Sequence, residues 1–317
     1  MRVVVSLGGN ALLRRGEATT VHNQQVAIAA AAAQLGPLAS GVELVVTHGN
    51  GPQVGLLALQ AAAYDDAAAY PFDVMDAQTE GMIGYLLERE LRNQLSDGRS
   101  VVSVLTMVEV SADDPAFGRP TKFVGPVYAE SEAQVLAARH GWTVAPDGDR
   151  WRRVVASPAP RAVVELGPIE QLLRAGCVVV CAGGGGIPVR RVPGSGRLEG
   201  VEAVVDKDRT SALLAAGLSA QLLVIATDVD AVYRGWGTAD ASRIYLVHPD
   251  DVDPAAFPSG SMGPKLEAAA TFARTGGDAV IGSIDDLRRL VEGGSGTRVS
   301  LRCRRAVVST AHPGSRE

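Results

Sequence analysis

The chain has 317 residues, enough for one large domain or two medium-sized ones. Hydrophobic residues make up 46% of it and aromatic residues only 4%, so its core must consist of Val, Leu, Ala and Ile, a composition that favours an α/β protein. The net charge of −5 gives no electrostatic support for binding nucleic acid.

The first residues, Met1 to Gly9, lack the long apolar run and the cleavage site of a secretory signal. The rest of the chain contains no run of about 18 apolar residues, the length that a membrane-spanning helix needs. We therefore expect a cytoplasmic protein without a membrane partner.

Strand, glycine turn and helix alternate at the start of the chain. Residues 3–7 predict a strand that ends in Gly8-Gly9-Asn10, and an alanine-rich helix follows over 23–39. Residues 42–47 predict a second strand, closed by His48-Gly49-Asn50-Gly51-Pro52. Because this order is typical of βαβ units, we expect a parallel sheet with ligands at the carboxyl ends of its strands.

An inserted lobe interrupts this alternation. A helix is predicted over 76–95 and a strand over 101–110. Residues 111–160 then combine many prolines, glycines and charges, which indicates a protruding subdomain rather than another βα repeat. Lys122 lies in this subdomain.

The alternation of helix and strand returns after the lobe. A helix over 168–175 and a strand over 177–182 precede the turn from Gly183 to Gly186. Cys177 and Cys181 lie in that strand. We interpret these two residues and Cys303 as buried thiols that pack as small hydrophobic groups rather than as a metal or redox pair.

The C-terminal part continues the pattern. We predict a helix over 211–216, a strand over 222–227, a helix from Lys265, a strand over 279–282, an edge strand over 297–301 and a frayed tail after Arg302. The strand at 222–227 runs into Thr227-Asp228-Val229-Asp230-Ala231-Val232-Tyr233, which suits an adenosine pocket. The alternative is an ordinary strand exit.

The glycine turns at strand ends are candidates for anion binding, because backbone N–H groups at such turns cradle anions. They are Gly8-Gly9-Asn10, His48-Gly49-Asn50-Gly51 and Gly183 to Gly186. Asn10 and Asn50 add amide donors that suit a small carboxylate, although Asn also forms turns and caps helices. We interpret His48 as a structural histidine that hydrogen-bonds its own loop.

Lysine is rare in this chain. Of the 30 Lys and Arg residues, only Lys122, Lys207 and Lys265 are lysines, and each lies among loop-forming residues. A chain that otherwise uses Arg should keep Lys where a compact ammonium group is needed. Three such groups would neutralise the charge of a phosphoryl group during its transfer.

The sequence Asp206-Lys207-Asp208, before a predicted helix, would place two carboxylates around one ammonium group. At a phosphoryl-transfer site Lys207 would contact the phosphate and Asp208 would orient the lysines. The alternative is a surface cap with Asp208 or Thr210 as N-cap. Because the sequence has no paired His ligands, we expect Mg²⁺ to arrive with the nucleotide rather than to occupy a metal site held by the protein. Neither a Walker A motif nor a G-x-G-x-x-G fingerprint is present, so a Walker-type ATPase and a dinucleotide dehydrogenase are poor fits.

Seven stretches resemble the carbamate kinases of the amino acid kinase superfamily, in family order and over nearly the whole chain. They are Leu7-Gly8-Gly9-Asn10-Ala11, His48-Gly49-Asn50-Gly51-Pro52-Gln53-Val54-Gly55, Pro120-Thr121-Lys122 with Gly125-Pro126, Trp151-Arg152-Arg153-Val154-Val155 with Ser157-Pro158, Gly183-Gly184-Gly185-Gly186-Ile187-Pro188-Val189, Gly200-Val201-Glu202-Ala203-Val204-Val205-Asp206-Lys207-Asp208, and Gly260-Ser261-Met262 with Pro264-Lys265. Many superfamily relatives carry a lysine just before the first Gly-Gly turn, where this chain has Ser6 and Leu7. Carbamate kinases share that absence, which favours them over acetylglutamate and uridylate kinases.

The resemblance implies an open αβα sandwich with a mainly parallel central sheet and a small protruding subdomain. It implies a homodimer, formed through the N-terminal half, that transfers a phosphoryl group reversibly between ATP and carbamate, giving ADP and carbamoyl phosphate. Residues 1–217, including the subdomain at 111–160, would form the carbamate-binding lobe. Residues 218–317 would form the nucleotide-binding lobe, with a flexible tail from about 303.

The resemblance also implies roles for individual residues. Lys207 and Lys265 would hold the transferring phosphoryl group and the nucleotide phosphates, Lys122 would close over the site, and Asp208 would organise the lysines with Asp206 beside it. The small anion would bind Gly8, Gly9, Asn10, Gly49, Asn50 and Gly51. The nucleotide would contact Gly184, Gly185, Thr227, Asp228, Tyr233, Met262 and Lys265.

Two other functions stay open from the sequence. One is a kinase of the same fold that acts on another small acid, and the other is a non-catalytic sensor of nucleotide or carbamoyl phosphate. The retention of three lysines and two aspartates argues against the sensor, because binding alone would tolerate arginine at phosphate contacts.

Overall fold

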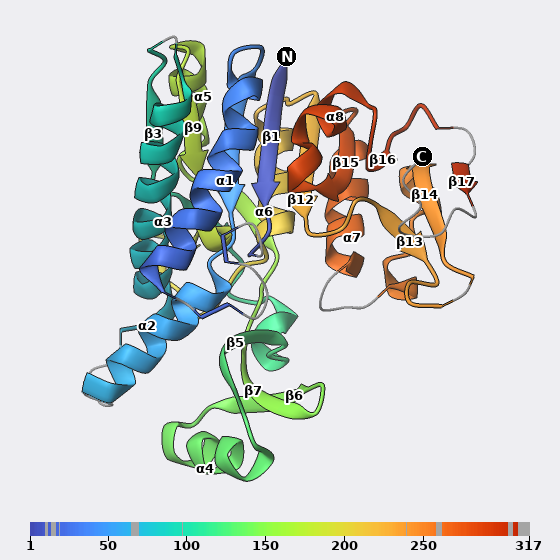
Figure 1. The fold of residues 1–317 in the computed structure, drawn as a ribbon. Helices are drawn as coiled ribbons and strands as arrows, with labels where there is room; N and C mark the ends of the chain where they lie inside the picture. Colours follow the sequence, from blue (N-terminus) through green and yellow to red (C-terminus); the bar gives the residue numbers. More distant parts are fainter. Residues whose placement is uncertain are drawn as a thin grey trace.

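The computed structural model of the chain describes residues 1–9, 12–13, 17–18, 20–64, 70–96, 98–238, 240–257, 262–303 and 307–309. Its body is a central sheet with helices on both faces (Figure 1). The strands of that sheet are β1 (Arg2–Leu7), β2 (Glu43–His48), β3 (Val101–Val104), β9 (Val178–Cys181), β12 (Leu222–Thr227), β13 (Val232–Arg234), β14 (Ser242–Val247), β15 (Asp278–Ser283), β16 (Thr297–Val299) and β17 (Val307–Ser309).

The strand order of the described residues is β13-β14-β16-β15-β12-β1-β2-β9-β3, with β17 paired to β14. From β15 to β3 every neighbouring pair is parallel. Strands β13 and β17 are antiparallel to β14, and β16 is antiparallel to β15. Because the parallel strands share one direction, their carboxyl ends and the turns that follow them meet at one edge of the sheet.

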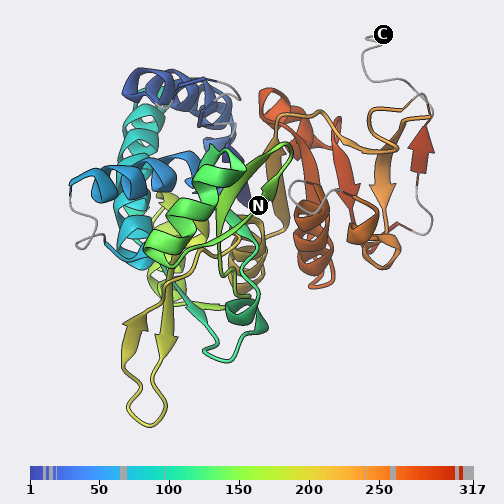
Figure 2. The same cartoon turned by 90° about the horizontal axis from the view of Figure 1, so that it is seen from below.

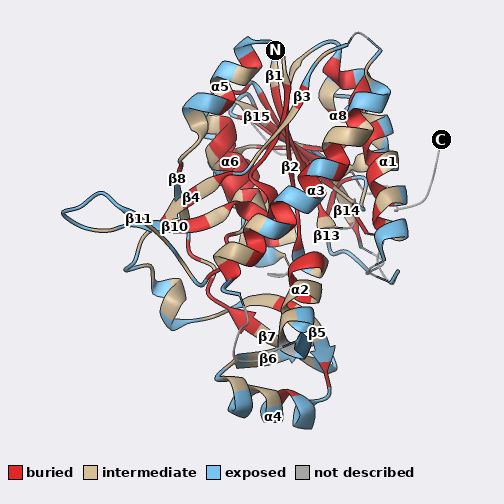
Figure 3. Ribbon diagram, turned by 90° about the vertical axis from the view of Figure 1, so that its left-hand side faces the viewer, coloured by how far each residue is buried: buried red, intermediate tan, exposed pale blue. Residues whose placement is uncertain are grey.

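Helices cover both faces of the sheet (Figure 3). One face carries α1 (Val21–Ala39), α3 (Phe72–Gln94) and α8 (Leu287–Glu292), and the other carries α5 (Leu166–Arg174), α6 (Lys207–Gly217) and α7 (Met262–Ala273). The strands alternate between the two layers. Val3 and Val5 pack in the cluster that contains Ile28 of α1, whereas Val4 packs in the cluster that contains Leu214 of α6.

A small lobe projects from this body (Figure 1). It consists of β5 (Lys122–Tyr128), α4 (Glu130–His140), β6 (Thr143–Asp147) and β7 (Arg150–Val155), whose strands form a sheet in the order β5-β7-β6. The lobe rests on α2 (Gly51–Tyr64), where a Cβ atom on Gly55 would lie only 2.6 Å from Cα of Gly125. The two backbones are therefore in direct contact, which requires glycine at position 55.

A further sheet lies beside the lobe. Its strands are β4 (Met107–Val110), β8 (Pro160–Val163), β10 (Ile187–Arg191) and β11 (Leu198–Gly200), in the order β11-β10-β4-β8. The hairpin of β10 and β11 extends away from the body (Figure 2). Short 3-10 helices are η3 (Pro115–Gly118), η4 (Gly183–Gly185), η5 (Pro249–Asp251), η6 (Pro254–Ala256) and η7 (Ile284–Asp286).

The prediction of one strand over 101–110 was wrong. The segment forms β3 in the central sheet and β4 in the smaller one, and the chain changes sheet at Leu105 and Thr106. Thr106 leaves the ladder because its N–H donates to Oε2 of Glu80 at 3.1 Å and its hydroxyl donates to the Val104 carbonyl at 2.7 Å. A long-range contact that local propensity does not encode thus divides the strand.

One prediction near the C-terminus was also wrong. The strand expected at the edge of the sheet, β16, lies inside it between β14 and β15, and β13 and β3 are the edge strands of the described part. Within the tail that was expected to be frayed, the described residues 307–309 form β17, which pairs with β14. Of the cysteines, Cys181 and Cys303 are buried and Cys177 is half-buried. None of the helices in the described part of the chain combines the length and apolar character needed to cross a membrane.

Candidate active site

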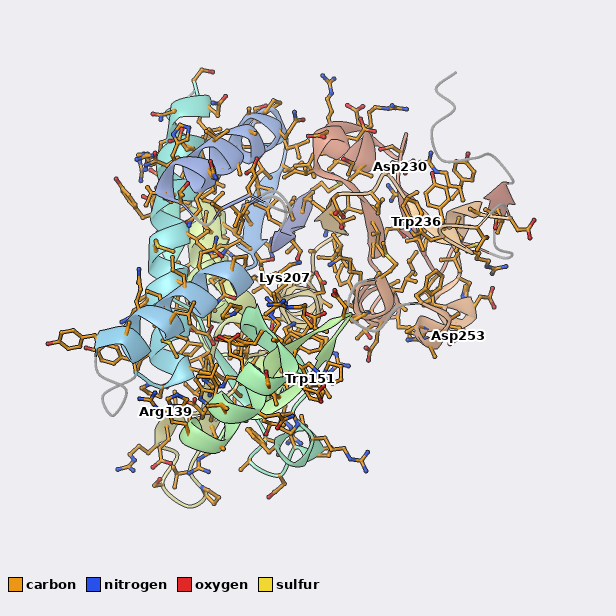
Figure 4. The ribbon with its side chains drawn as sticks, turned by 60° about the horizontal axis from the view of Figure 1, so that its bottom comes forward. Arg139, Trp151, Lys207, Asp230, Trp236 and Asp253 are labelled. Carbon is orange, nitrogen blue, oxygen red and sulfur yellow. The ribbon has the colours of Figure 1, made fainter. Side chains whose placement is uncertain are left out.

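The turns after β1, β2 and β9 meet at the carboxyl edge of the sheet, as their parallel pairing requires. A Cβ atom on Gly49 would lie 3.3 Å from the backbone nitrogen of Gly9 and 3.7 Å from Cδ of Lys207. The first two predicted turns and one of the three lysines are therefore neighbours. Figure 4 shows Lys207 at the centre of the molecule, between the body and the lobe.

Asp208 joins two of the lysines. Its Oδ1 accepts a hydrogen bond from Nζ of Lys207 at 2.5 Å, and its Oδ2 accepts one from Nζ of Lys265 at 2.9 Å. Ser6, at the end of β1, accepts from Lys207 at 2.9 Å and donates to Oδ1 of Asp208 at 3.2 Å. The side chains of Ser6, Asp208 and the two lysines thus form one connected cluster.

The start of α6 fixes this cluster. Asp206 is the N-cap residue, and its Oδ1 accepts the N–H groups of Asp208 at 3.0 Å and Arg209 at 3.3 Å. The alternative interpretation of this segment, a surface cap, is correct in that the segment does cap a helix. The cap residue, however, is Asp206 rather than Asp208 or Thr210. Asp208 and Thr210 are buried.

Electrostatics keep Asp208 ionised in spite of its burial. Burial alone would raise its pKa, but the ammonium groups of Lys207 and Lys265 hold the pKa of Asp208 far below its usual value. Burial lowers the pKa of Lys207, an effect that Asp208 opposes. The pKa of Lys265 is raised, because the attraction of Asp208 outweighs burial.

The third lysine reaches the same place from the lobe. Nζ of Lys122, on β5, donates to Oδ2 of Asp206 at 2.8 Å. Burial of Asp206 acts to raise its pKa, but the charge of Lys122 outweighs it and the pKa is lowered. Three ammonium groups thus lie close to the carboxylates of Asp206 and Asp208, and Asp228 at the end of β12 also acts on Lys265.

Asn50 is held by helix α3. Its Nδ2 donates to Oδ1 of Asp76 and to Oγ1 of Thr79, both at 2.9 Å. The amide donors of Asn50, which the sequence suggested for a small carboxylate, are thus used within the protein. At the start of α2, Pro52 has no N–H group, and the N–H groups of Gln53 and Val54 donate to the Asn50 carbonyl, both at 2.9 Å.

The glycines of η4 allow close packing. A Cβ atom on Gly184 would lie 2.2 Å from Nδ2 of Asn50, and one on Gly185, whose φ is +109°, would lie 2.4 Å from the Val205 carbonyl oxygen. The backbone of these two glycines therefore packs between the Asn50 loop and the start of α6. Their predicted contact with nucleotide stays a prediction.

A second polar cluster lies behind these turns, and sequence reasoning missed most of it. Glu80 of α3 accepts the Gly183 N–H with Oε1 at 2.8 Å and the Thr106 N–H with Oε2 at 3.1 Å. Asp76 and Glu80 are four residues apart on the buried face of α3. Two acids on the core face of an amphipathic helix were the signal that could have identified them.

The predicted structural role of His48 is confirmed. Its Nδ1 donates to the carbonyl of Gly49 at 2.9 Å, and the residue is fully buried. Burial lowers the pKa of His48 to about 4, so the ring is neutral. Burial also raises the pKa of Asp76 well above its usual value.

Four other residues expected at the nucleotide, Thr227, Asp228, Tyr233 and Met262, come from the end of β12, from β13 and from the start of α7. Thr227 and Asp228 end β12, with Oγ1 of Thr227 donating to Oδ1 of Asp228 at 3.1 Å. The Tyr233 hydroxyl donates to the Asp230 carboxylate at 3.1 Å. Figure 4 shows Asp230 and Trp236 in this part of the molecule. Met262 begins α7, three residues before Lys265. Asn10 lies outside the described residues.

The family model for the amino acid kinase family matches residues 1–283. The chain belongs to the amino acid kinase family. It is 54% identical over 302 residues to a carbamate kinase of Rhizobium meliloti, covering 95% of this chain and 93% of that one. It is 50% identical over 301 residues to a carbamate kinase of Haemophilus influenzae, covering 95% and 97%.

Solved structures agree with this assignment. Carbamate kinase from Giardia lamblia bound to AMP-PNP is 35% identical and superposes with a TM-score of 0.85, covering 94% of this chain and 98% of that one. The predicted amino acid kinase fold, an αβα sandwich with a mainly parallel sheet, is confirmed. The family's phosphoryl chemistry fits a cluster of three lysines at the carboxyl edge of the sheet.

The contact of Gly183 with His48 and Glu80 yields a prediction about stability. A Cβ atom at position 183 would lie 2.3 Å from Cε1 of His48 and 3.1 Å from Cγ of Glu80. We expect Gly183→Ala to lower the free energy of unfolding by about 1–3 kcal/mol, since both neighbours are buried. Gly167→Ala is the matched control, because a Cβ atom there meets nothing within 4 Å. Urea denaturation should show the control unchanged or slightly stabilised; equal stability of the two variants would contradict the packing argument.

Proposed function

We propose that the protein is a cytoplasmic carbamate kinase, which transfers a phosphoryl group reversibly between Mg·ATP and carbamate and runs in the cell toward ATP synthesis from carbamoyl phosphate. The observation that carries this proposal is the position of Asp208 between Lys207 and Lys265, with Lys122 reaching the same helix start from the lobe. The relatives at 54% and 50% identity, both carbamate kinases, support it over nearly the whole chain.

The lysine cluster suits the charge of this reaction. Carbamate, carbamoyl phosphate and the nucleotide phosphates are all anions, and their approach during transfer requires neutralising groups that are already in place. Lys207 and Lys265 are held by Asp208, so their ammonium groups need little reorganisation before they contact the phosphoryl oxygens. Carbamate attacks in its ionised form, so the site needs no general base, in keeping with the neutral and buried His48.

We assign the small anion to residues 1–217 and the nucleotide to residues 218–317. The turns at Gly8-Gly9-Asn10 and Gly49-Asn50-Gly51 would bind carbamate through backbone N–H groups other than those of Gly8 and Gly49, which donate to the carbonyls of Ala226 and Leu7. Thr227, Asp228, Tyr233 and Met262 would border the adenosine, next to Lys265. Mg²⁺ would enter as part of the nucleotide substrate.

The proposal is tested by ATP formation from ADP, Mg²⁺ and carbamoyl phosphate, with acetyl phosphate and acetylglutamyl phosphate as control donors. Rapid ATP formation from carbamoyl phosphate alone is the expected result. Activity with another acyl phosphate alone would show that the protein is a kinase of a different small acid. ADP binding without any turnover would favour the sensor instead.

Exchange of the clustered lysines for arginine should impair turnover. A planar guanidinium group cannot reproduce the contacts of a compact ammonium group, so we expect Lys207→Arg and Lys265→Arg each to lower kcat by about 100-fold or more. Arg209→Lys is a matched control on the same helix turn. The guanidinium group of Arg209 forms an ion pair of 2.9 Å with Glu267 rather than with a residue of the lysine cluster. Steady-state kinetics that place either lysine variant within a few-fold of the parent would refute the role of the cluster.

Lys122 should affect turnover more than nucleotide binding. It contacts Asp206 from the lobe, whereas the proposed adenosine residues come from the end of β12, from β13 and from the start of α7. We therefore expect Lys122→Ala to reduce kcat by at least about tenfold while the Kd for ADP changes less than threefold. Calorimetry that finds ADP binding abolished would place Lys122 in the nucleotide pocket.

We also propose that the protein is a homodimer formed through its N-terminal half. Large apolar side chains of Met82 and Tyr85 on α3 are 38% and 59% exposed, and Leu105, 55% exposed, lies beside Gly81 of the same helix. An apolar patch of this kind is typical of a protein interface. Sedimentation velocity should detect a dimer that Tyr85→Glu weakens and Tyr70→Glu does not; a monomeric parent would exclude it.

A further inference from the structure

The side chain of Arg153, on β7 of the lobe, reaches one aromatic ring of the body and one of the lobe. Its Cζ atom lies 4.7 Å from the ring centroid of Phe72, the first residue of α3, and 4.6 Å from that of Trp142, which precedes β6. At such distances a guanidinium group is attracted to the face of an aromatic ring. The side chain of Arg153 is only 20% exposed, so water weakens these contacts little.

We propose that Arg153 is a positioning residue for phosphoryl transfer. It sets the tilt of the lobe on the body, and it thereby holds the ammonium group of Lys122 at Asp206, the N-cap residue of α6. The inference rests on the proposed function, in which Lys122 acts on the transferring group, and adds to it a residue that works through Lys122.

Arg153 and Lys122 lie on the same face of the lobe. Strands β5 and β7 are antiparallel, with Lys122 opposite Val155 and Val124 opposite Arg153. Opposed residues of such a pair share a face, and so do residues two apart on one strand. Val124 and Val155 pack in one apolar cluster with Phe72, so this face meets the body. Figure 1 shows β5 and β7 between the body and α4.

Other contacts hold the base of the lobe. The N–H of Val204, in the segment before α6, donates to the carbonyl of Ala156, just after β7, at 3.0 Å. The backbone contact of Gly125 with Gly55 limits how near the lobe comes to α2. Beside Arg153 a cavity of about 20 Å³ is lined by residues of both parts, so close packing does not fill this seam. The tilt of the lobe about its base therefore depends on the contacts of Arg153.

Glu202 connects these contacts with the lysine cluster. Its Oε2 accepts the N–H of Phe72 at 2.8 Å, and its Oε1 lies 3.9 Å from Nη2 of Arg153. Glu202 is four residues before Asp206, whose Oδ2 accepts from Lys122. Arg153 thus contacts the start of α3 and faces the segment that carries the acceptor of Lys122.

The effect of Arg153 should pass through Lys122. The side chain of Lys122 is 35% exposed, so the position of its strand, rather than burial, determines where its ammonium group lies. A tilt of β7 would move the paired strand β5 with it. Displacement of a catalytic group by about 1 Å can cost on the order of 100-fold in rate.

The first test is a double-mutant cycle measured by ATP formation from ADP, Mg²⁺ and carbamoyl phosphate. We expect Arg153→Ala to lower kcat at least about fivefold in the parent but less than about twofold in Lys122→Ala, because nothing is left there to position. The Kd for ADP should change less than about threefold in each variant. Arg150→Ala is the matched control, since Arg150 is an exposed arginine of the same strand, and it should keep the kcat of the parent.

Variants of Trp142 separate the aromatic contact from folding. Trp142→Phe keeps an aromatic face, so its kcat should stay within about twofold of the parent, whereas Trp142→Leu should lower kcat about as much as Arg153→Ala. Arg153→Lys keeps the charge without the planar group, so it should not restore the kcat of the parent. If Arg153→Ala does not fold, the Trp142 variants still decide the question.

The second test reads the position of Lys122 without any turnover. Because the chain has only three lysines, mass spectrometry can follow the acetylation of each by an N-hydroxysuccinimide ester of acetic acid. The ion pair with Asp206 keeps Lys122 protonated and slow to react. We expect Arg153→Ala to speed the acetylation of Lys122 at least about threefold while Lys207 and Lys265, held by Asp208, react as in the parent.

Several outcomes would overturn the inference. They are a kcat of Arg153→Ala within about twofold of the parent, an equal loss in the Lys122→Ala background, a lost affinity for ADP, or an unchanged acetylation rate of Lys122. Each would refute the role of Arg153 and leave carbamate kinase activity established. A parent that forms no ATP from carbamoyl phosphate would instead refute the proposed function, and the acetylation of Lys122 would still decide whether Arg153 positions the lobe.

Discussion

The bidentate contact of Asp208 with Lys207 and Lys265 is the interaction on which the site depends. Two ammonium groups buried side by side repel each other strongly where the dielectric constant is low, and each is poorly solvated. A carboxylate between them makes the arrangement possible, and both of its oxygens are used. Its place is fixed by the first turn of α6, so the cap residue Asp206 helps to position Asp208 through the geometry of the helix.

The parallel sheet supplies the rest of the site. Parallel strands end together, so segments that are far apart in sequence, from Ser6 to Thr227, lie along one edge. The turns there approach neighbouring segments more closely than side chains would permit. A Cβ atom at Gly184 would collide with Asn50, and one at Gly185 with the Val205 carbonyl. Glycine at these positions therefore lets the turns pack directly against the Asn50 loop and the start of α6.

Much of this could be predicted from the sequence because its signals are local. Aliphatic strands followed by glycine turns indicated the parallel sheet, and the scarcity of lysine marked Lys122, Lys207 and Lys265, which the structure brings to one helix start. The division of 101–110 into two strands could not be predicted, because a hydrogen bond from Thr106 to Glu80 causes it. Strand order is also non-local, which is why β16 was wrongly expected at the edge.

The two acidic clusters of the site reach opposite charge states by the same physical rule. Asp208 and Glu80 are both buried, but Asp208 faces two ammonium groups whereas Glu80 faces backbone N–H groups, other acids and a neutral imidazole. The first environment compensates a full negative charge and the second does not. Burial therefore serves both clusters, because it removes the water that would otherwise screen the lysines and hydrate Glu80.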